Sequence, residues 1–146
     1  MRTFSKYLFV LLPLCVSACT SAPIQENPGT PLEKTQWRLA RLEGKSVPPS
    51  GKSAYLLLEA GRLNGFGGCN RLVGSYKLEG ANLEFSAPAG TLMACMDAIS
   101  QQENAFIQRI PQVKSWAIQG QTLRLGDATD AIILELEAEP PLTPEP

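Results

Sequence analysis

Residues 65–76 read GFGGCNRLVGSY, and the rest of the chain is organised around this stretch. Four glycines within ten positions let the backbone reach positive φ and let a neighbouring segment approach closely. A second stretch, TLMACM at residues 91–96, carries Cys95, which besides Cys69 is the only cysteine beyond residue 19. We expect the two stretches to meet in the folded protein.

The glycine-rich stretch lacks the features of a phosphate-binding loop. It has no Gly-Lys-Ser/Thr ending, and its GFGG sequence lacks the spacing of a dinucleotide site. Glycines in sheet proteins commonly mark bulges or places where backbones come close. The sequence therefore predicts a bend between strands, in which Asn70 adopts a left-handed conformation or bonds to nearby backbone and Arg71 is a surface charge.

The composition is that of one globular domain. The chain has 146 residues, of which 44% are apolar and 18% charged. It contains no histidine, which excludes Ser-His-Asp and Cys-His catalysis and histidine metal sites. The net charge is −1 and the basic residues are scattered singly, so nucleic-acid binding lacks its usual electrostatic signature.

Residues 1–18 have the layout of a bacterial signal peptide, with a basic start, an apolar run and a small-residue end. The apolar run, residues 7–16, is shorter than the roughly 20 residues that cross a bilayer as a helix. Residues 16–19 (VSAC) resemble a lipobox, in which small residues precede an acylated cysteine. This pattern predicts lipidation of Cys19 and attachment to a membrane. Ordinary secretion, with cleavage at the end of the same segment, is the alternative.

The ends of the chain are predicted to lie outside the fold. Residues 19–34 form the lipidated N-terminus and a polar tether with three prolines, and residues 139–146 form a Pro-rich disordered tail. Because Thr20 is not the aspartate associated with inner-membrane retention, we expect the inner leaflet of the outer membrane, with the domain facing the periplasm. The folded domain then spans residues 35–138.

Alternating apolar and polar residues predict about seven or eight short strands that form hairpins. Repeated hairpins imply an antiparallel sheet, which we expect to curl into a barrel-like shape with one covering helix. The fold class is α+β, mostly β. The predicted strands are residues 36–42, 54–59, 62–65, 72–78, 83–85, 114–119, 122–125 and 131–137.

One helix is predicted at about residues 98–110. It begins near Asp97 or Ser100, where Ser100 and Glu103 fit a capping box, and Pro111 ends it. Asp97 and Glu103 could also form a catalytic carboxylate pair, but capping and the helix dipole explain both more simply. The predicted buried stripe of the helix comprises Ile99, Phe106, Ile110 and Val113.

No other residues suggest catalysis more strongly. Ser75 and Lys77 would lie on one face of a strand, where a solvated polar face is the usual explanation. We therefore expect no enzymatic activity. The aromatic residues are expected in the core rather than in a ligand cage; they are Trp37, Phe66, Tyr76, Phe85, Phe106 and Trp116.

Several short motifs are distributed along the folded part. They comprise Trp37, Leu39, Gly44, Gly65, Gly67, Gly68, Cys69, Asn70, Gly74, Tyr76, Thr91, Met93, Ala94, Cys95, Glu103, Leu123 and Leu125. Together they resemble the META domain of the HslJ-like heat-shock lipoprotein type, over about residues 35–137. The resemblance implies a small β-rich, barrel-like domain of bacterial envelopes, associated with stress and antibiotic tolerance and without an established catalytic activity.

Cys69 and Cys95 are expected to form a disulfide, because two cysteines in an exported domain usually pair. Closing this loop would stabilise the fold by about 3–4 kcal/mol on the chain-entropy model. The alternative is a Cu(I) or thiol-redox site, in which Met93 and Met96 join the two cysteines as sulfur ligands. Methionines, however, more often fill cores.

The leading functional hypothesis is a monomeric, non-enzymatic, lipid-anchored envelope protein without a cofactor. Its partner is an unidentified envelope protein or a small molecule. A deep apolar pocket with convergent polar groups would favour the small molecule, and an exposed apolar patch beside Phe66 would favour the protein.

Overall fold

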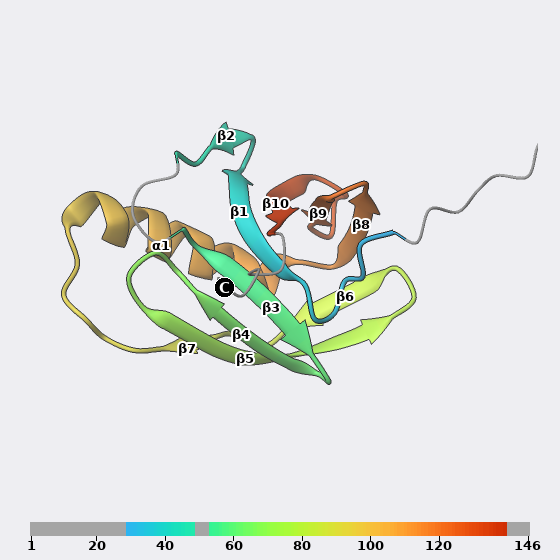
Figure 1. The fold of residues 1–146 in the computed structure, drawn as a ribbon, viewed down its shortest axis with the longest axis horizontal. Coiled ribbons are helices and arrows are strands. Elements are labelled where there is room, and N and C mark those ends of the chain that lie inside the picture. Colours follow the sequence, from blue (N-terminus) through green and yellow to red (C-terminus); the bar gives the residue numbers. More distant parts are fainter. Residues whose placement is uncertain (1–28, 49–52, 140–146) are drawn as a thin grey trace, which may run out of the picture.

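The computed structural model describes residues 29–48 and 53–139 (Figure 1). The predicted signal peptide, Cys19 and almost the whole predicted tail lie outside these residues. The described chain forms one antiparallel ten-stranded sheet, the helix α1 and a short 3-10 helix η1. The elements are β1 Gln36–Leu42, β2 Lys45–Ser46, β3 Tyr55–Glu59, β4 Arg62–Phe66, β5 Arg71–Glu79, β6 Asn82–Phe85, β7 Ala89–Gly90, α1 Asp97–Arg109, η1 Ile110–Gln112, β8 Ser115–Gln119, β9 Thr122–Gly126 and β10 Ile132–Ala138.

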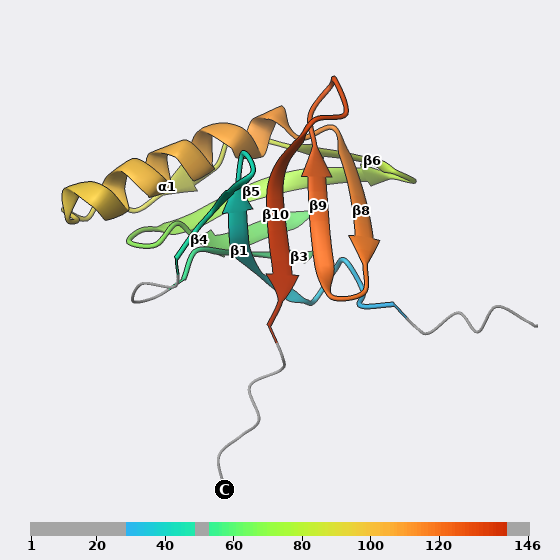
Figure 2. The ribbon, with the colours of Figure 1, turned by 90° about the horizontal axis from the view of Figure 1, so that it is seen from above.

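The sheet closes on itself because β1 pairs with β10 on one side and with β3 on the other. The order round the ring is β1, β10, β9, β8, β6, β5, β4 and β3 (Figure 2). The join between β6 and β8 is thin, with one residue pair, Asn82 with Ser115. The arrangement is therefore ring-like rather than a formal barrel, and the predicted mostly-β, barrel-like fold with one helix is confirmed.

The interior of the ring is filled by alternate residues of its strands. Trp37 is fully buried, and its indole nitrogen donates a hydrogen bond to the Leu32 carbonyl at 2.9 Å. Of the six aromatic residues predicted in the core, Phe66 and Trp116 are only half-buried. The other four are buried, namely Trp37, Tyr76, Phe85 and Phe106.

The helix α1 begins at Asp97, the earlier of the two expected positions, and η1, which contains Pro111, follows it. The predicted capping box is wrong. The residue preceding the helix is Met96, no side chain caps the N-terminus, and Ser100 already lies within the first turns. Glu103 is instead buried. Among the described residues, no helix has the length and apolar character needed to span a membrane.

Candidate functional site

The glycine-rich stretch and the TLMACM segment, residues 91–96, meet as expected. The first runs from β4 into β5, and the second connects β7 to α1. A disulfide joins Cys69 to Cys95, whose Cα atoms lie 6.2 Å apart. This is the pairing that the sequence favours, and it uses two of the four sulfur atoms that the copper alternative requires. Among the described residues, no group of three or more cysteine, aspartate or glutamate side chains could hold a metal ion.

A buried carboxylate from α1 holds the glycine-rich stretch. Glu103 Oε2 accepts hydrogen bonds from the backbone N–H groups of Cys69 at 3.1 Å and Asn70 at 2.7 Å. Its Oε1 accepts from Asn70 Nδ2 at 2.6 Å. Glu103 is 5% exposed, and these bonds link the middle of the helix to the connection between β4 and β5.

Asn70 extends the same network to the TLMACM segment. Its Oδ1 accepts hydrogen bonds from Thr91 Oγ1 at 2.9 Å and from the Met93 N–H at 2.7 Å. Its Nδ2 also lies 3.7 Å from Cys95 Sγ. Asn70 is buried and does not have a positive φ, so of the two alternatives it bonds to nearby groups rather than adopting the left-handed conformation.

Gly67 and Gly68 each require glycine for a different structural reason. A Cβ atom added to Gly67 would lie 2.4 Å from Glu103 Oε2, so a side chain there would collide with the carboxylate. Gly68 has φ +117°, a conformation that residues with a side chain rarely adopt. Arg71 follows on β5 with an exposed side chain, as predicted. The GG dipeptide therefore makes room for Glu103 and turns the chain into Cys69.

The electrostatics of Glu103 favour the ionised form. Burial raises the pKa of its carboxyl, but the hydrogen bonds from Asn70 and from the Cys69 backbone lower it more, so the net pKa lies below the ordinary value. In the described residues, every buried side-chain nitrogen and oxygen has a hydrogen-bond partner. Glu103 thus acts as a structural clamp, because both of its oxygens are engaged within the protein.

The other catalytic candidates do not form a site. Asp97 is exposed at the start of α1, whereas Glu103 is buried in the clamp. Ser75 and Lys77 are both exposed on β5, as a solvated strand face requires. The backbone N–H of Ser75 donates to Ser86 Oγ at 3.0 Å, which is a contact between β5 and the residue that follows β6.

Two motif residues on β5 serve the fold. Gly74 has Ser86 Oγ 3.3 Å from where its Cβ would lie, so it permits close packing beside β5. Tyr76 is buried against Phe85, with ring centroids 6.2 Å apart, and its hydroxyl donates a hydrogen bond to Glu33. Burial and the Glu33 carboxylate raise the pKa of Tyr76.

The TLMACM segment exposes its apolar side chains while its backbone is held. Leu92 is 100% exposed, Met93 58% and Met96 73%. Ala94 is exposed as well. The expectation that these methionines fill the core is therefore wrong. Phe66, beside which an exposed patch would favour a protein partner, is half-buried and stacks on Tyr55 at a centroid distance of 6.2 Å.

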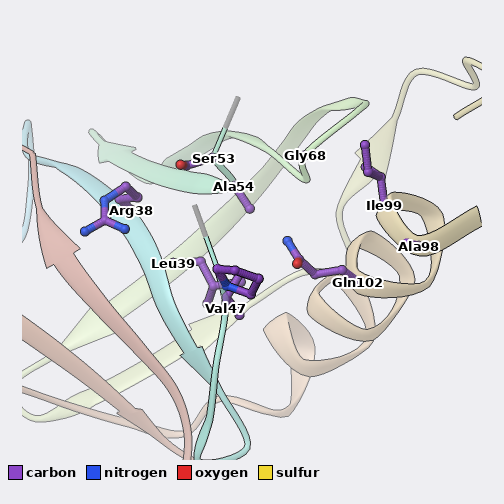
Figure 3. Close-up of a pocket in the computed structure, with 10 residues that line it drawn as sticks. Arg38, Leu39, Val47, Ser53, Ala54, Gly68, Ala98, Ile99 and Gln102 are labelled. Atoms are coloured by element: carbon purple, nitrogen blue, oxygen red, sulfur yellow. The ribbon is translucent and has the colours of Figure 1, made fainter. Parts of the chain in front are cut away.

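A small pocket lies between α1 and the strands (Figure 3). Its volume is about 140 Å³, and Gln102 reaches from α1 toward Leu39 and Val47. Ligand pockets usually have volumes of about 300–1,000 Å³. This pocket is therefore too small for most metabolites. It is not the deep apolar cavity with converging polar groups that would favour a small molecule.

Comparison with known proteins gives the family. The model of the META domain matches residues 30–140, three quarters of the chain. The chain belongs to the META domain family. A similar fold is seen in an NMR structure of a protein from Burkholderia xenovorans, which is 28% identical to this chain with a TM-score of 0.61. The match covers 74% of this chain and 83% of that one.

A second NMR structure shares the fold at 20% identity and a TM-score of 0.58, with 73% of this chain covering 90% of that one. No curated protein matches this META domain protein. The family model and the structural neighbours therefore establish the fold, and they do not indicate an enzymatic activity.

Sequence reasoning missed the role of Glu103, although one signal was present. Glu103 lies four residues after Ile99 and three before Phe106, in the middle of the predicted apolar stripe of α1. A carboxylate in that position faces inward, where it needs partners. The backbone amides of the Gly-Gly-Cys-Asn turn provide them.

Proposed function

We propose that this META domain protein is a non-enzymatic interaction module of the bacterial envelope, which presents the TLMACM segment to a protein partner. The observation that carries the proposal is the exposure of Leu92, Met93 and Met96 on a backbone fixed by a disulfide and by Asn70. Exposed apolar groups favour association. A backbone that is already ordered lowers the entropy lost on binding.

A protein partner fits better than a small molecule. The pocket beside α1 has a volume of only about 140 Å³, and the larger hollow beside Trp116, about 540 Å³, is shallow and open to solvent. The apolar side chains of the TLMACM segment, in contrast, project from the surface. The buried polar groups of the Glu103 clamp already have hydrogen-bond partners within the protein. Methionine suits such a surface, because its flexible thioether adapts to differently shaped partners.

We further propose that Cys19 carries a lipid anchor and that the domain faces the periplasm from the outer membrane. Nine residues separate Cys19 from Gly29, a reach of at most about 35 Å. The start of the described chain (blue) and the connection that leads into α1 (yellow), which contains the TLMACM segment, lie at opposite ends of the molecule in both views (Figures 1 and 2). The anchored domain would then present the TLMACM segment away from the lipid surface, toward a periplasmic partner serving stress or antibiotic tolerance.

The test is site-specific photocrosslinking in intact cells. A photoreactive residue replaces Leu92 in the full-length protein, and a matched control carries it at Gln119, which is also exposed but lies on the β8–β9 hairpin. We expect a discrete adduct from position 92 that is absent from position 119. Failure of position 92 to give any specific adduct would contradict the proposal.

A further inference from the structure

The sulfur atoms of the described residues are gathered in one place. Cys69, Met93, Cys95 and Met96 all belong to the disulfide-linked site, and the buried core of the described residues contains no methionine. We infer that Met93 and Met96 form an oxidation site, at which hydroperoxides convert the TLMACM segment from an apolar to a polar surface without unfolding the domain. The consequence for docking rests on the proposed function.

Access to oxidant follows from the exposure of the two side chains. Met93 is 58% exposed and Met96 73%, so a small oxidant can reach both thioethers from solvent. Cys69 and Cys95 have no free thiolate in the disulfide, and the thiolate is the form from which cysteine oxidation starts. The two methionines are therefore the most readily oxidised groups of this site.

The chemical step is a two-electron oxygen transfer. A lone pair of the thioether sulfur attacks one oxygen of hydrogen peroxide, so that an S–O bond forms as the O–O bond breaks. The departing hydroxide takes the proton of the transferred oxygen and leaves as water. Sulfur is oxidised to the sulfoxide and peroxide is reduced; methionine sulfoxide reductases carry out the reverse conversion.

The structure separates this step from the stability of the fold. The Met93 contact in the network is made by its backbone N–H, which donates to Asn70 Oδ1 at 2.7 Å, and the sulfur takes no part in it. The segment is also tied through Cys95. Because neither methionine belongs to the core, a sulfoxide oxygen displaces no packed side chain.

The change in polarity is what a partner would sense. A sulfoxide is polar and chiral, so burying it in an apolar interface without a hydrogen-bond donor is unfavourable. One such buried group weakens binding by roughly tenfold or more. Oxidation of Met93 and Met96 would therefore release a partner docked on Leu92 and its neighbours.

The experiment treats the full-length protein with hydrogen peroxide, with and without the photoreactive residue at position 92. Peptide mass spectrometry gives sulfoxide occupancy, thermal melting gives stability, and hydrophobic-interaction chromatography reports surface polarity. Met93→Leu/Met96→Leu keeps the apolar character but cannot be oxidised, whereas Met93→Gln/Met96→Gln imitates the polar product. These two double variants are matched controls.

We expect sulfoxide at both positions, a melting temperature within about 2 °C of the untreated protein, earlier chromatographic elution and at least a tenfold loss of crosslinking. The leucine variant should keep its elution and its crosslink after peroxide, and the glutamine variant should lack the crosslink from the start. Methionines that stay reduced, or oxidation that unfolds the domain, would overturn the oxidation site.

Two crosslinking results separate this inference from the proposed function. Equal adduct yields from the reduced and oxidised protein would overturn the switch, although docking itself would stand. Absence of any adduct from position 92 in both states would overturn docking. Sulfoxide formation with unchanged melting would still establish the oxidation site in that case.

Discussion

Replacing Glu103 by glutamine tests the clamp at the centre of the site. The carboxylate accepts three hydrogen bonds, through Oε2 from the Cys69 and Asn70 backbone and through Oε1 from Asn70 Nδ2. Glutamine has one acceptor oxygen. If this oxygen keeps the two backbone donors, the new NH₂ group faces Asn70 Nδ2, donor against donor.

The expected loss can be worked from these contacts. A hydrogen bond to a charged group contributes about 1.5–3 kcal/mol, and a buried donor left unpaired costs about 1–3 kcal/mol. Turning the Asn70 amide over would restore the pair but would break its bonds to Thr91 and Met93. We therefore expect Glu103→Gln to lower the free energy of unfolding by about 2–4 kcal/mol.

A second substitution should repair the first. In the variant Glu103→Gln/Asn70→Asp, the glutamine NH₂ donates to the carboxylate introduced at position 70, while the glutamine oxygen keeps the two backbone bonds. The other oxygen of that carboxylate would still accept from Thr91 and Met93, as Asn70 does. The double variant should regain stability to within about 1 kcal/mol of the original protein, whereas Asn70→Asp alone places two carboxylates face to face and should be destabilised.

The assay is urea unfolding at neutral pH with the disulfide intact, followed by tryptophan fluorescence, for both single variants and the double variant. Asn104→Ala is the control, because Asn104 is exposed on the same helix and should change stability by no more than about 0.5 kcal/mol. An unchanged Glu103→Gln variant, or a double variant whose loss equals the sum of the single losses, would refute the clamp.

The remaining predictions concern the same site and the anchor. Because the pKa of Glu103 is lowered in the folded protein, its contribution to stability is complete above the unfolded carboxyl pKa of about 4.3 and is lost as the pH falls through the lower folded value. The free energies of unfolding of the native protein and of Glu103→Gln should therefore converge as the pH is lowered. A constant difference between the two across this pH range would contradict the prediction. Replacing Cys69 and Cys95 by serine should lower the free energy of unfolding by about 3–4 kcal/mol. A reductant should lower the melting temperature of the native protein but not that of the serine variant. Gly67→Ala should lower the free energy of unfolding by about 2 kcal/mol or more, because the added methyl group collides with the Glu103 side chain. In a Glu103→Ala background the same substitution should lower it much less, and additive losses would rule out the collision. Cys19→Ala should release the protein from membranes or leave it unprocessed on cell fractionation, and normal processing with retention would disprove the anchor.

The strands were predictable because their patterns are local. Alternation placed the eight strands of the ring within one or two residues of their observed bounds. The strands β2 and β7 were missed since each has two residues, too few for a period to be seen. The helix face was largely predictable too, and Phe106 and Ile110 are buried as expected, although Ile99 is only half-buried.

The site was predictable in its location and not in its bonding. The motifs brought Cys69 and Cys95 together, but Ser100 and Glu103 fit a local capping rule that a tertiary contact overrides. The partners of Glu103 lie 33 and 34 residues away, where no periodic pattern connects them. The exposure of Met93 and Met96 was likewise hidden, because composition gives methionine a core preference.

The closure of the ring by β1 has a consequence for how the molecule folds. Trp37 of β1 lies opposite Ala138 of β10, so the first and last strands of the domain must find each other across nearly the whole length of the domain. Such high contact order slows folding. During synthesis from the N-terminus, β1 emerges long before β10, and the edge of β1 that pairs with β10 stays open meanwhile. The ring can therefore close only after the last strand has been synthesised.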